Sequence, residues 1–174
     1  MPELWQRRDF LSSLAVAAGV SPTVLPLLVD PQARLPGGSD TDRVILDAAV
    51  VLEHQAVAIY EIGLERDLFP SKFRQYAAAF RGDHTSHRDT QISIVGKRGG
   101  TAPGPRSSYE FPGMGPGEAV IKVALGVEIG AQAAYMKLLS HIQTNDYLLS
   151  AAFILVDEIR HMTVWREVLG YSIY

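Results

Sequence analysis

Four stretches of the chain repeat apolar residues at helical spacing. In the first stretch the apolar positions are Val44, Ile45, Ala48, Val51, Leu52, Ile59, Ile62 and Leu64, close to the 3.6-residue period of an α-helix. Similar patterns follow, and together they predict helices over about 41–67, 72–95, 117–141 and 146–169. No stretch alternates with the two-residue period of a half-buried strand, so the fold class is predicted to be all-α.

Cap and breaker residues place the predicted helix boundaries. N-cap oxygens are expected from residues 39–41 for the first helix, from Ser71 for the second, and from Thr144 or Asn145 for the fourth. Pro70 is expected to end the first helix, because a proline cannot continue it. Both short connections then join antiparallel neighbours, which gives two helical hairpins.

The segment between the second and third helices, residues 97–116, is rich in Gly and Pro and is predicted to be a crossover loop. A loop of this length without structure of its own is uncommon in a compact domain. A loop of this length is needed, however, if it must connect opposite ends of a helical bundle, a distance of about 35 Å for helices of this size. The sequence therefore predicts a four-helix bundle with one long crossover, over residues 38–174.

Two parts of the chain carry the same polar pattern. Glu53 and Tyr60 in the first helix correspond to Glu128 and Tyr135 in the third, and Asp83-His84-x-x-His87 in the second corresponds to Asp157-Glu158-x-x-His161 in the fourth, at nearly the same interval along the chain. Residues three or seven apart on a helix share a face. All four helices are thus expected to aim polar side chains at the bundle interior.

Carboxylates and imidazoles gathered in an apolar interior point to a metal centre. An unpaired buried carboxylate costs several kcal/mol, and a bound cation removes that cost. The predicted ligands are Glu53, His84, His87, Glu128, Glu158 and His161, with Tyr60, Tyr135, Asp83 and Asp157 expected to hydrogen-bond to them. Considered alone, each glutamate could also lie at the solvent-exposed border of an apolar helix face, and His-x-x-His could be two histidines on the protein surface.

Composition narrows the chemistry. The chain has 174 residues, no cysteine and a net charge of −3. Disulfides, thiolate metal sites and a rubredoxin-type iron centre are therefore excluded, and oxygen and nitrogen ligands suit iron, manganese or zinc. No basic patch or stripe indicates nucleic-acid binding.

The pattern resembles the ferritin-like superfamily of di-metal carboxylate proteins, which includes bacterioferritins and rubrerythrins. In that family two helices each supply a Glu and two each supply Glu-x-x-His. Over residues from about 40 to 170, Glu53, Glu128 and Glu158-x-x-His161 match directly. His84 departs from the pattern, because it stands where the family has Glu and removes one bridging carboxylate.

The resemblance implies two metal ions, iron foremost with manganese or zinc as alternatives. An iron or manganese pair would react with oxygen or peroxide in iron oxidation or oxidative-stress defence. Such an oxidoreductase would need an external electron donor, because no cysteine-bound electron-transfer module is present. The alternative is a non-catalytic ferritin-like stress or binding protein whose site is empty or holds one structural metal. The His84 departure favours this alternative.

The N-terminal segment, residues 1–37, resembles a twin-arginine export signal with a linker. Arg7 and Arg8 are followed, after one residue, by Phe10 and Leu11, and an apolar stretch continues to Val29. The signal implies recognition by the twin-arginine translocase and a periplasmic or extracellular location, with a membrane-anchored form if the segment stays uncleaved. One alternative is a short amphipathic helix that packs on the domain, with Arg7 and Arg8 present by chance. Another is an interaction helix whose apolar surface over residues 10–29 would favour oligomers such as a homodimer. The resemblance is nearest to small exported ferritin-like and desiccation-related proteins.

Overall fold

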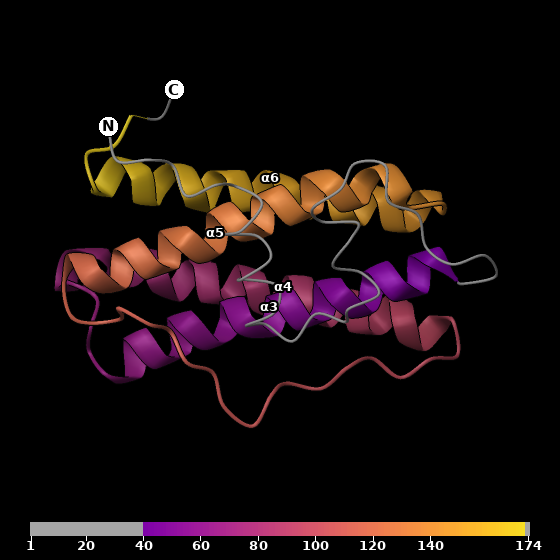
Figure 1. The fold of residues 1–174 in the computed structure, drawn as a ribbon, viewed down its shortest axis with the longest axis horizontal. Helices are drawn as coiled ribbons and strands as arrows, with labels where there is room; N and C mark the ends of the chain where they lie inside the picture. Colours follow the sequence, from indigo (N-terminus) through magenta and orange to yellow (C-terminus); the bar gives the residue numbers. More distant parts are fainter. Residues whose placement is uncertain (1–39, 173–174) are drawn as a thin grey trace.

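The computed structural model describes residues 40–172, and these form a bundle of four long α-helices with no β-strand among them (Figure 1). The helices are α3 (Thr41–Glu65), α4 (Arg74–Lys97), α5 (Glu118–Leu138) and α6 (Asn145–Val168). Single 3₁₀ turns, η1 (Ser71–Phe73) and η2 (Leu139–His141), precede α4 and follow α5. The all-α prediction is confirmed. The predicted export signal, with Arg7 and Arg8, lies outside the described residues.

The helices form two antiparallel hairpins, α3 with α4 and α5 with α6, which pack side by side through α3 against α5 and α4 against α6 (Figure 1). The link between α4 and α5 runs along the length of the bundle. Near its start, the Arg43 side chain donates to the Thr101 carbonyl at 2.7 Å. At its end, the Gly117 backbone donates to the Leu68 carbonyl at 2.9 Å. These ties confirm the predicted crossover.

Two apolar clusters fill the bundle, and a polar layer separates them. One cluster gathers Ile45, Leu46, Leu52, Val95, Leu138, Tyr147 and Ile154 near one end. The other gathers Ile59, Tyr60, Phe69, Phe80, Ile121, Leu125 and Trp165 near the opposite end. On every helix the predicted ligands fall between the residues of the two clusters. The clusters therefore close the polar layer off from water at both ends.

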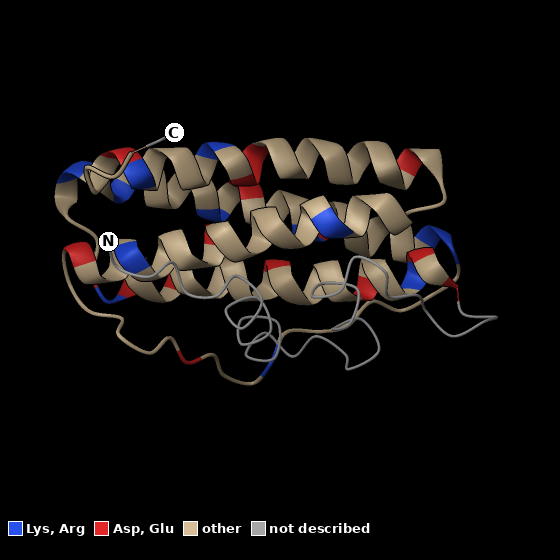
Figure 2. Cartoon of the chain, turned by 45° about the horizontal axis from the view of Figure 1, so that its top comes forward, with Lys and Arg blue, Asp and Glu red and all other residues tan. Residues whose placement is uncertain are grey.

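The high apolar content of α5 reflects this central position. With η2 it is long and apolar enough, by composition, to cross a membrane, yet 56% of its most apolar window is buried inside the bundle. On the face shown in Figure 2, acidic and basic residues are interspersed along the helices. That face carries no stripe of a single charge.

Two predicted caps are wrong. Asp40 caps α3 as expected, with Oδ1 accepting from the Arg43 backbone at 3.0 Å. Ser71 begins η1 instead of capping α4, whose N-cap residue, Phe73, has no side chain able to accept the bond. Thr144 occupies the N-cap position of α6, but its side chain makes no capping bond. The helix α3 also ends at Glu65, ahead of Pro70, because Asp67 adopts a φ of 53°.

Asp42 of α3 holds the turn that leads into α6, while the Tyr147 backbone inside α6 donates to Asp146 Oδ1 at 2.9 Å. The Asp42 carboxylate accepts hydrogen bonds from the Gln143 backbone at 2.7 Å, the Thr144 backbone at 3.0 Å and the Thr144 hydroxyl at 2.7 Å. Arg98, at the end of α4, lies 3.4 Å away. One buried carboxylate thus ties three helices together and satisfies free N–H groups ahead of α6.

Candidate metal centre

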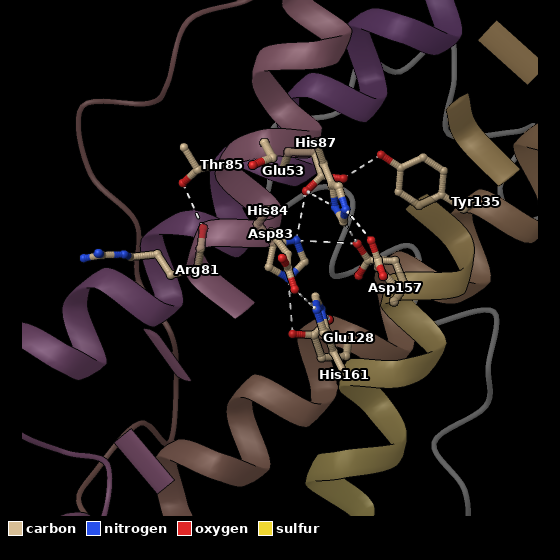
Figure 3. Close-up of polar contacts among 12 residues, drawn as sticks. Glu53, Arg81, Asp83, His84, Thr85, His87, Glu128, Tyr135, Asp157 and His161 are labelled. Atoms are coloured by element: carbon tan, nitrogen blue, oxygen red, sulfur yellow. Dashed lines mark hydrogen bonds and ion pairs between the residues drawn. The ribbon is translucent and has the colours of Figure 1, made fainter. Parts of the chain in front are cut away.

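The six predicted ligands meet in the polar layer, with at least one from each helix (Figure 3). All six are buried, and His87 is the most exposed at 8%. Glu53 lies on α3, Glu128 on α5, and the two pairs spaced by three residues lie on α4 and α6. Because residues three apart lie on the same face of a helix, both members of each pair point into the bundle.

One half of the layer contains Glu53 and His87. His84 Nδ1 lies 2.9 Å from Glu53 Oε2, and His87 Nδ1 lies 3.8 Å from the same oxygen. Glu158 completes this half, with its Oε1 3.4 Å from His87 Nδ1 and 3.5 Å from His84 Nδ1. Two carboxylates and two imidazoles thus face one small volume.

The other half contains Glu128 and His161. His161 Nδ1 lies 3.4 Å from Glu128 Oε2, and His84 Nε2 lies 3.3 Å from Glu128 Oε1. Two groups of four residues could each hold a cation: Glu53, His84, His87 and Glu158, and His84, Glu128, Glu158 and His161. Within each group one ligand atom per residue lies within 4.8 Å of the others. His84 and Glu158 belong to both groups.

The two tyrosines hydrogen-bond to the outer glutamates, each across to the helix that carries the other tyrosine. Tyr135 of α5 donates to Glu53 Oε1 on α3 at 2.6 Å. Tyr60 of α3 donates to Glu128 Oε1 on α5. Burial and the neighbouring carboxylates raise the pKa of both phenols, so both keep their protons at neutral pH. Each tyrosine therefore holds Oε1 of one glutamate and leaves Oε2 facing the histidines of the layer.

Sequence reasoning missed the residues that donate to these tyrosines. The Gln91 side-chain amide donates to the Tyr135 oxygen, and Trp165 Nε1 donates to the Tyr60 oxygen at 2.7 Å. A signal was available, because the interval along the chain from Gln91 to Trp165 equals the interval that relates the two ligand pairs. Each also follows the second ligand of the pair on its helix, His87 or His161, by four residues and so extends the same inward face.

The two aspartates orient the histidines of the opposite hairpin. His87 Nε2 lies 3.2 Å from Asp157 Oδ2, and His161 Nε2 lies 3.0 Å from Asp83 Oδ2. Arg160 joins the aspartates, with Nη2 2.7 Å from Asp83 and 3.2 Å from Asp157. Because Nε2 donates outward to a carboxylate, Nδ1 of each histidine is left as the nitrogen that faces the interior.

Burial and charge set the protonation of the cluster. Burial alone would raise the pKa of Glu53, but hydrogen bonds and positive charge from His84 and His87 lower it to about 2. Opposing burial, neighbouring histidines hold the pKa of Glu128 well below its usual range. Burial would lower the pKa of the histidines, yet the carboxylates raise that of His87 to about 10 and that of His84 well above normal. At Glu158 burial prevails and raises the pKa to about 8.

These pKa shifts mean that, without a bound cation, protons on His84, His87 and Glu158 balance the negative charge of the cluster. Its atoms also fit a metal. His87 Nδ1, His161 Nδ1, Glu128 Oε2 and both oxygens of Glu158 are buried without a hydrogen-bond partner. Unpaired buried polar atoms are rare because each costs about 1–3 kcal/mol. All five belong to the predicted ligands and lie in the polar layer, where cations could satisfy them together.

Comparisons with known proteins agree with this architecture. A family model described as the ferritin-like domain matches residues 41–171. Among solved structures, the crystal structure of a conserved hypothetical protein, rv2844, from Mycobacterium tuberculosis is similar, with 26% identity and a TM-score of 0.70 over 75% of this chain and 91% of that chain. No curated protein matches. The family model spans most of the sequence and all six of the gathered ligands, so this chain belongs to the ferritin-like domain family.

Proposed function

We propose that the chain binds two metal ions, iron foremost with manganese as the alternative, and uses them to react with oxygen or peroxide. One observation carries the proposal: two overlapping groups of four buried ligands face each other across the bundle and share His84 and Glu158. A bound pair of redox-active ions would supply the electrons and the Lewis acidity. Iron oxidation or oxidative-stress defence is the physiological task that such a centre suits.

The protein's own contribution is to position and isolate the ligands. Tyr60 and Tyr135 fix the outer carboxylates, and Asp83 and Asp157 fix the histidine rings. Such outer contacts are commonly worth about 10- to 100-fold in metal affinity. The apolar clusters on both sides keep bulk water out, which strengthens every electrostatic interaction in the layer.

We also propose export through the twin-arginine route, on the strength of Arg7-Arg8 and the apolar residues that follow them. The centre would then work in the periplasm or outside the cell, with an external electron donor. A fusion of residues 1–37 to a reporter tests this: export that is lost when both arginines become lysine supports it, and export that survives the change refutes it.

Anaerobic purification, elemental analysis and rapid mixing with oxygen or peroxide test the metal chemistry. Glu128→Ala removes a ligand that is 0% exposed, and Glu61→Ala removes an exposed glutamate of α3 as a matched control. We expect two metals per chain and a metal-dependent reaction in the wild type and the control, and loss of both in Glu128→Ala. A reaction that survives in Glu128→Ala contradicts the assignment.

The second candidate is a non-catalytic protein with one structural metal or none. His84 favours it, because an imidazole cannot offer the two oxygens of the carboxylate that the family places there. Elemental analysis separates the two candidates. One zinc ion per chain, or no metal, together with no reaction towards oxygen or peroxide, would support the non-catalytic protein.

A further inference from the structure

His84 of α4 and Glu158 of α6 occupy equivalent positions in the two helical hairpins. The interval between them along the chain is the same as that from His87 to His161 and from Gln91 to Trp165. These two residues alone belong to both ligand groups among the described residues. The pseudo-symmetry of the centre is therefore broken at its middle, where one shared residue is a carboxylate and the other is an imidazole.

The His84 ring presents a different nitrogen to each half. Nδ1 lies 2.9 Å from Glu53 and 3.5 Å from Glu158, on the side that contains His87. Nε2 lies 3.3 Å from Glu128, on the side that contains His161. A histidine that binds a single metal uses one ring nitrogen for the metal and donates from the other to a carbonyl or carboxylate. His87 and His161 have this arrangement, with their Nε2 atoms bonded to the aspartates.

Packing holds the ring in this orientation. His84 is 0% exposed, and its ring stacks on Tyr60 with centroids 5.7 Å apart and an angle of 22°. The ring centroids of His161 and His87 lie 5.1 and 5.8 Å from that of His84, with interplanar angles of 63° and 84°. A half-turn of the ring would place carbons against Glu53 and Glu128, so the contacts of Nδ1 and Nε2 with these carboxylates select the observed orientation.

We propose that His84 bridges the two metal ions, one bound through each ring nitrogen, in place of the carboxylate bridge that the family pattern places at this position. The inference rests on the proposed metal centre and adds how its two ions are linked. A ring bound through both nitrogens carries no proton and hence one negative charge.

Charge balance supports the bridge. Glu53, Glu128 and Glu158 carry three negative charges, and a doubly bound His84 ring carries a fourth. Two divalent cations neutralise these four charges. With a neutral His84 ring, the six buried ligands and two divalent cations would together carry one positive charge, which only Asp83 and Asp157, outside the ligand set and paired with Arg160, would face. The bridge therefore restores the charge that replacing Glu by His removes.

The bridge predicts a distinctive spacing. Carboxylate-bridged pairs of metals lie about 3.5–4 Å apart. Ions bound to opposite nitrogens of one imidazole lie roughly 6 Å apart, since each metal–nitrogen bond of about 2.0–2.1 Å extends outward from the ring. The separation of the two ions thus reports the identity of the bridge without any measurement of activity.

The test loads the metal-free full chain with Co²⁺ under anaerobic conditions and measures the ions bound per chain and the metal–metal separation in the crystal. We expect two ions roughly 6 Å apart in the wild type. His84→Glu restores Glu-x-x-His and should bind two ions about 3.5–4 Å apart. His141→Glu, at a histidine of η2 outside the centre, is the matched control and should keep the wild-type spacing.

The outcomes separate the bridge from the centre itself. Two wild-type ions about 3.5–4 Å apart, or two ions with His84 on only one of them, overturn the bridge and leave the proposed metal centre standing. Binding of one Co²⁺ or none overturns the two-metal centre and the bridge with it. Because the wild type alone decides between these outcomes, the result does not depend on whether His84→Glu folds.

Discussion

Removing the Tyr135 hydroxyl should destabilise the metal-free protein far more than the loss of one exposed phenol would. The phenol is 1% exposed, donates to Glu53 at 2.6 Å and accepts from the Gln91 amide. Tyr135→Phe keeps the ring and its packing, and it removes both hydrogen bonds at once. It therefore isolates the polar contribution of this tyrosine to the centre.

The magnitude follows from the two partners left behind. A hydrogen bond to a charged group contributes about 1.5–3 kcal/mol, and a buried group left unpaired costs about 1–3 kcal/mol. Gln91 is 0% exposed, and the Tyr135 oxygen is the hydrogen-bond partner of its amide nitrogen, so Tyr135→Phe leaves that buried donor unpaired. We expect Tyr135→Phe to lower the free energy of unfolding by about 3–5 kcal/mol.

The assay is urea unfolding at pH 7, followed by the helical circular dichroism signal. Tyr147→Phe is the matched control, because Tyr147 is also 0% exposed but its hydroxyl has no partner. That change should be neutral or stabilising by up to about 1 kcal/mol. If Tyr135→Phe costs no more than Tyr147→Phe, the hydrogen bonds to Glu53 and Gln91 do not hold the centre together and the reasoning is refuted.

Three further predictions concern the metal-free fold. Burial raises the pKa of Glu158 to about 8 from 4.5, and Glu158 and Glu53 outweigh burial to raise that of His87 to about 10 from 6.5. The folded state thus binds these two protons more tightly than the unfolded state does. The resulting stabilisation is complete below the pKa values of the unfolded chain and is lost as the pH rises through about 8 and then 10. The free energy of unfolding measured by urea titration should therefore fall from pH 5 to 10, by up to about 1.4 kcal/mol per pH unit for each group, and a flat profile would contradict the shifts. Asp42→Ala should lower the free energy of unfolding by about 2–4 kcal/mol, since a buried carboxylate that accepts three hydrogen bonds is lost; a loss under about 1 kcal/mol in the same assay would show that Asp42 does not anchor the turn ahead of α6. Gly63→Ala should destabilise by about 1–3 kcal/mol, because the new Cβ would lie 2.5 Å from the buried Phe69 ring, whereas Gly82→Ala, with nothing within 4 Å, should stabilise α4 by about 0.5–1 kcal/mol, and equal melting temperatures for the two variants would contradict this account.

Much of this protein could be predicted from spacing along the chain. The 3.6-residue period located all four helices, and the Gly- and Pro-rich stretch located the crossover. The matching intervals between the two halves of the sequence selected Glu53, Glu128 and the two ligand pairs. This succeeded because helical periodicity is local: residues three, four or seven apart share a face whatever the helix packs against.

The helix boundaries were less predictable. Ser71 has the chemistry of an N-cap, yet the chain makes a 3₁₀ turn there. The turn ahead of α6 is held by Asp42, which lies far before Gln143 in the sequence, on another helix. A local rule cannot find such a partner, since any acceptor that packing brings to a helix start can satisfy its free N–H groups.

The pairing of side chains across the centre was also decided by the tertiary structure. The sequence indicated that His84 faces inward, but only the packing of four helices shows its two nitrogens pointing at different glutamates. Likewise Asp83 serves His161 on another helix instead of its neighbour His87. A sequence fixes which face of a helix a residue occupies, whereas the depth, rotation and crossing of packed helices fix which atom meets which, and those depend on all the side chains between them at once.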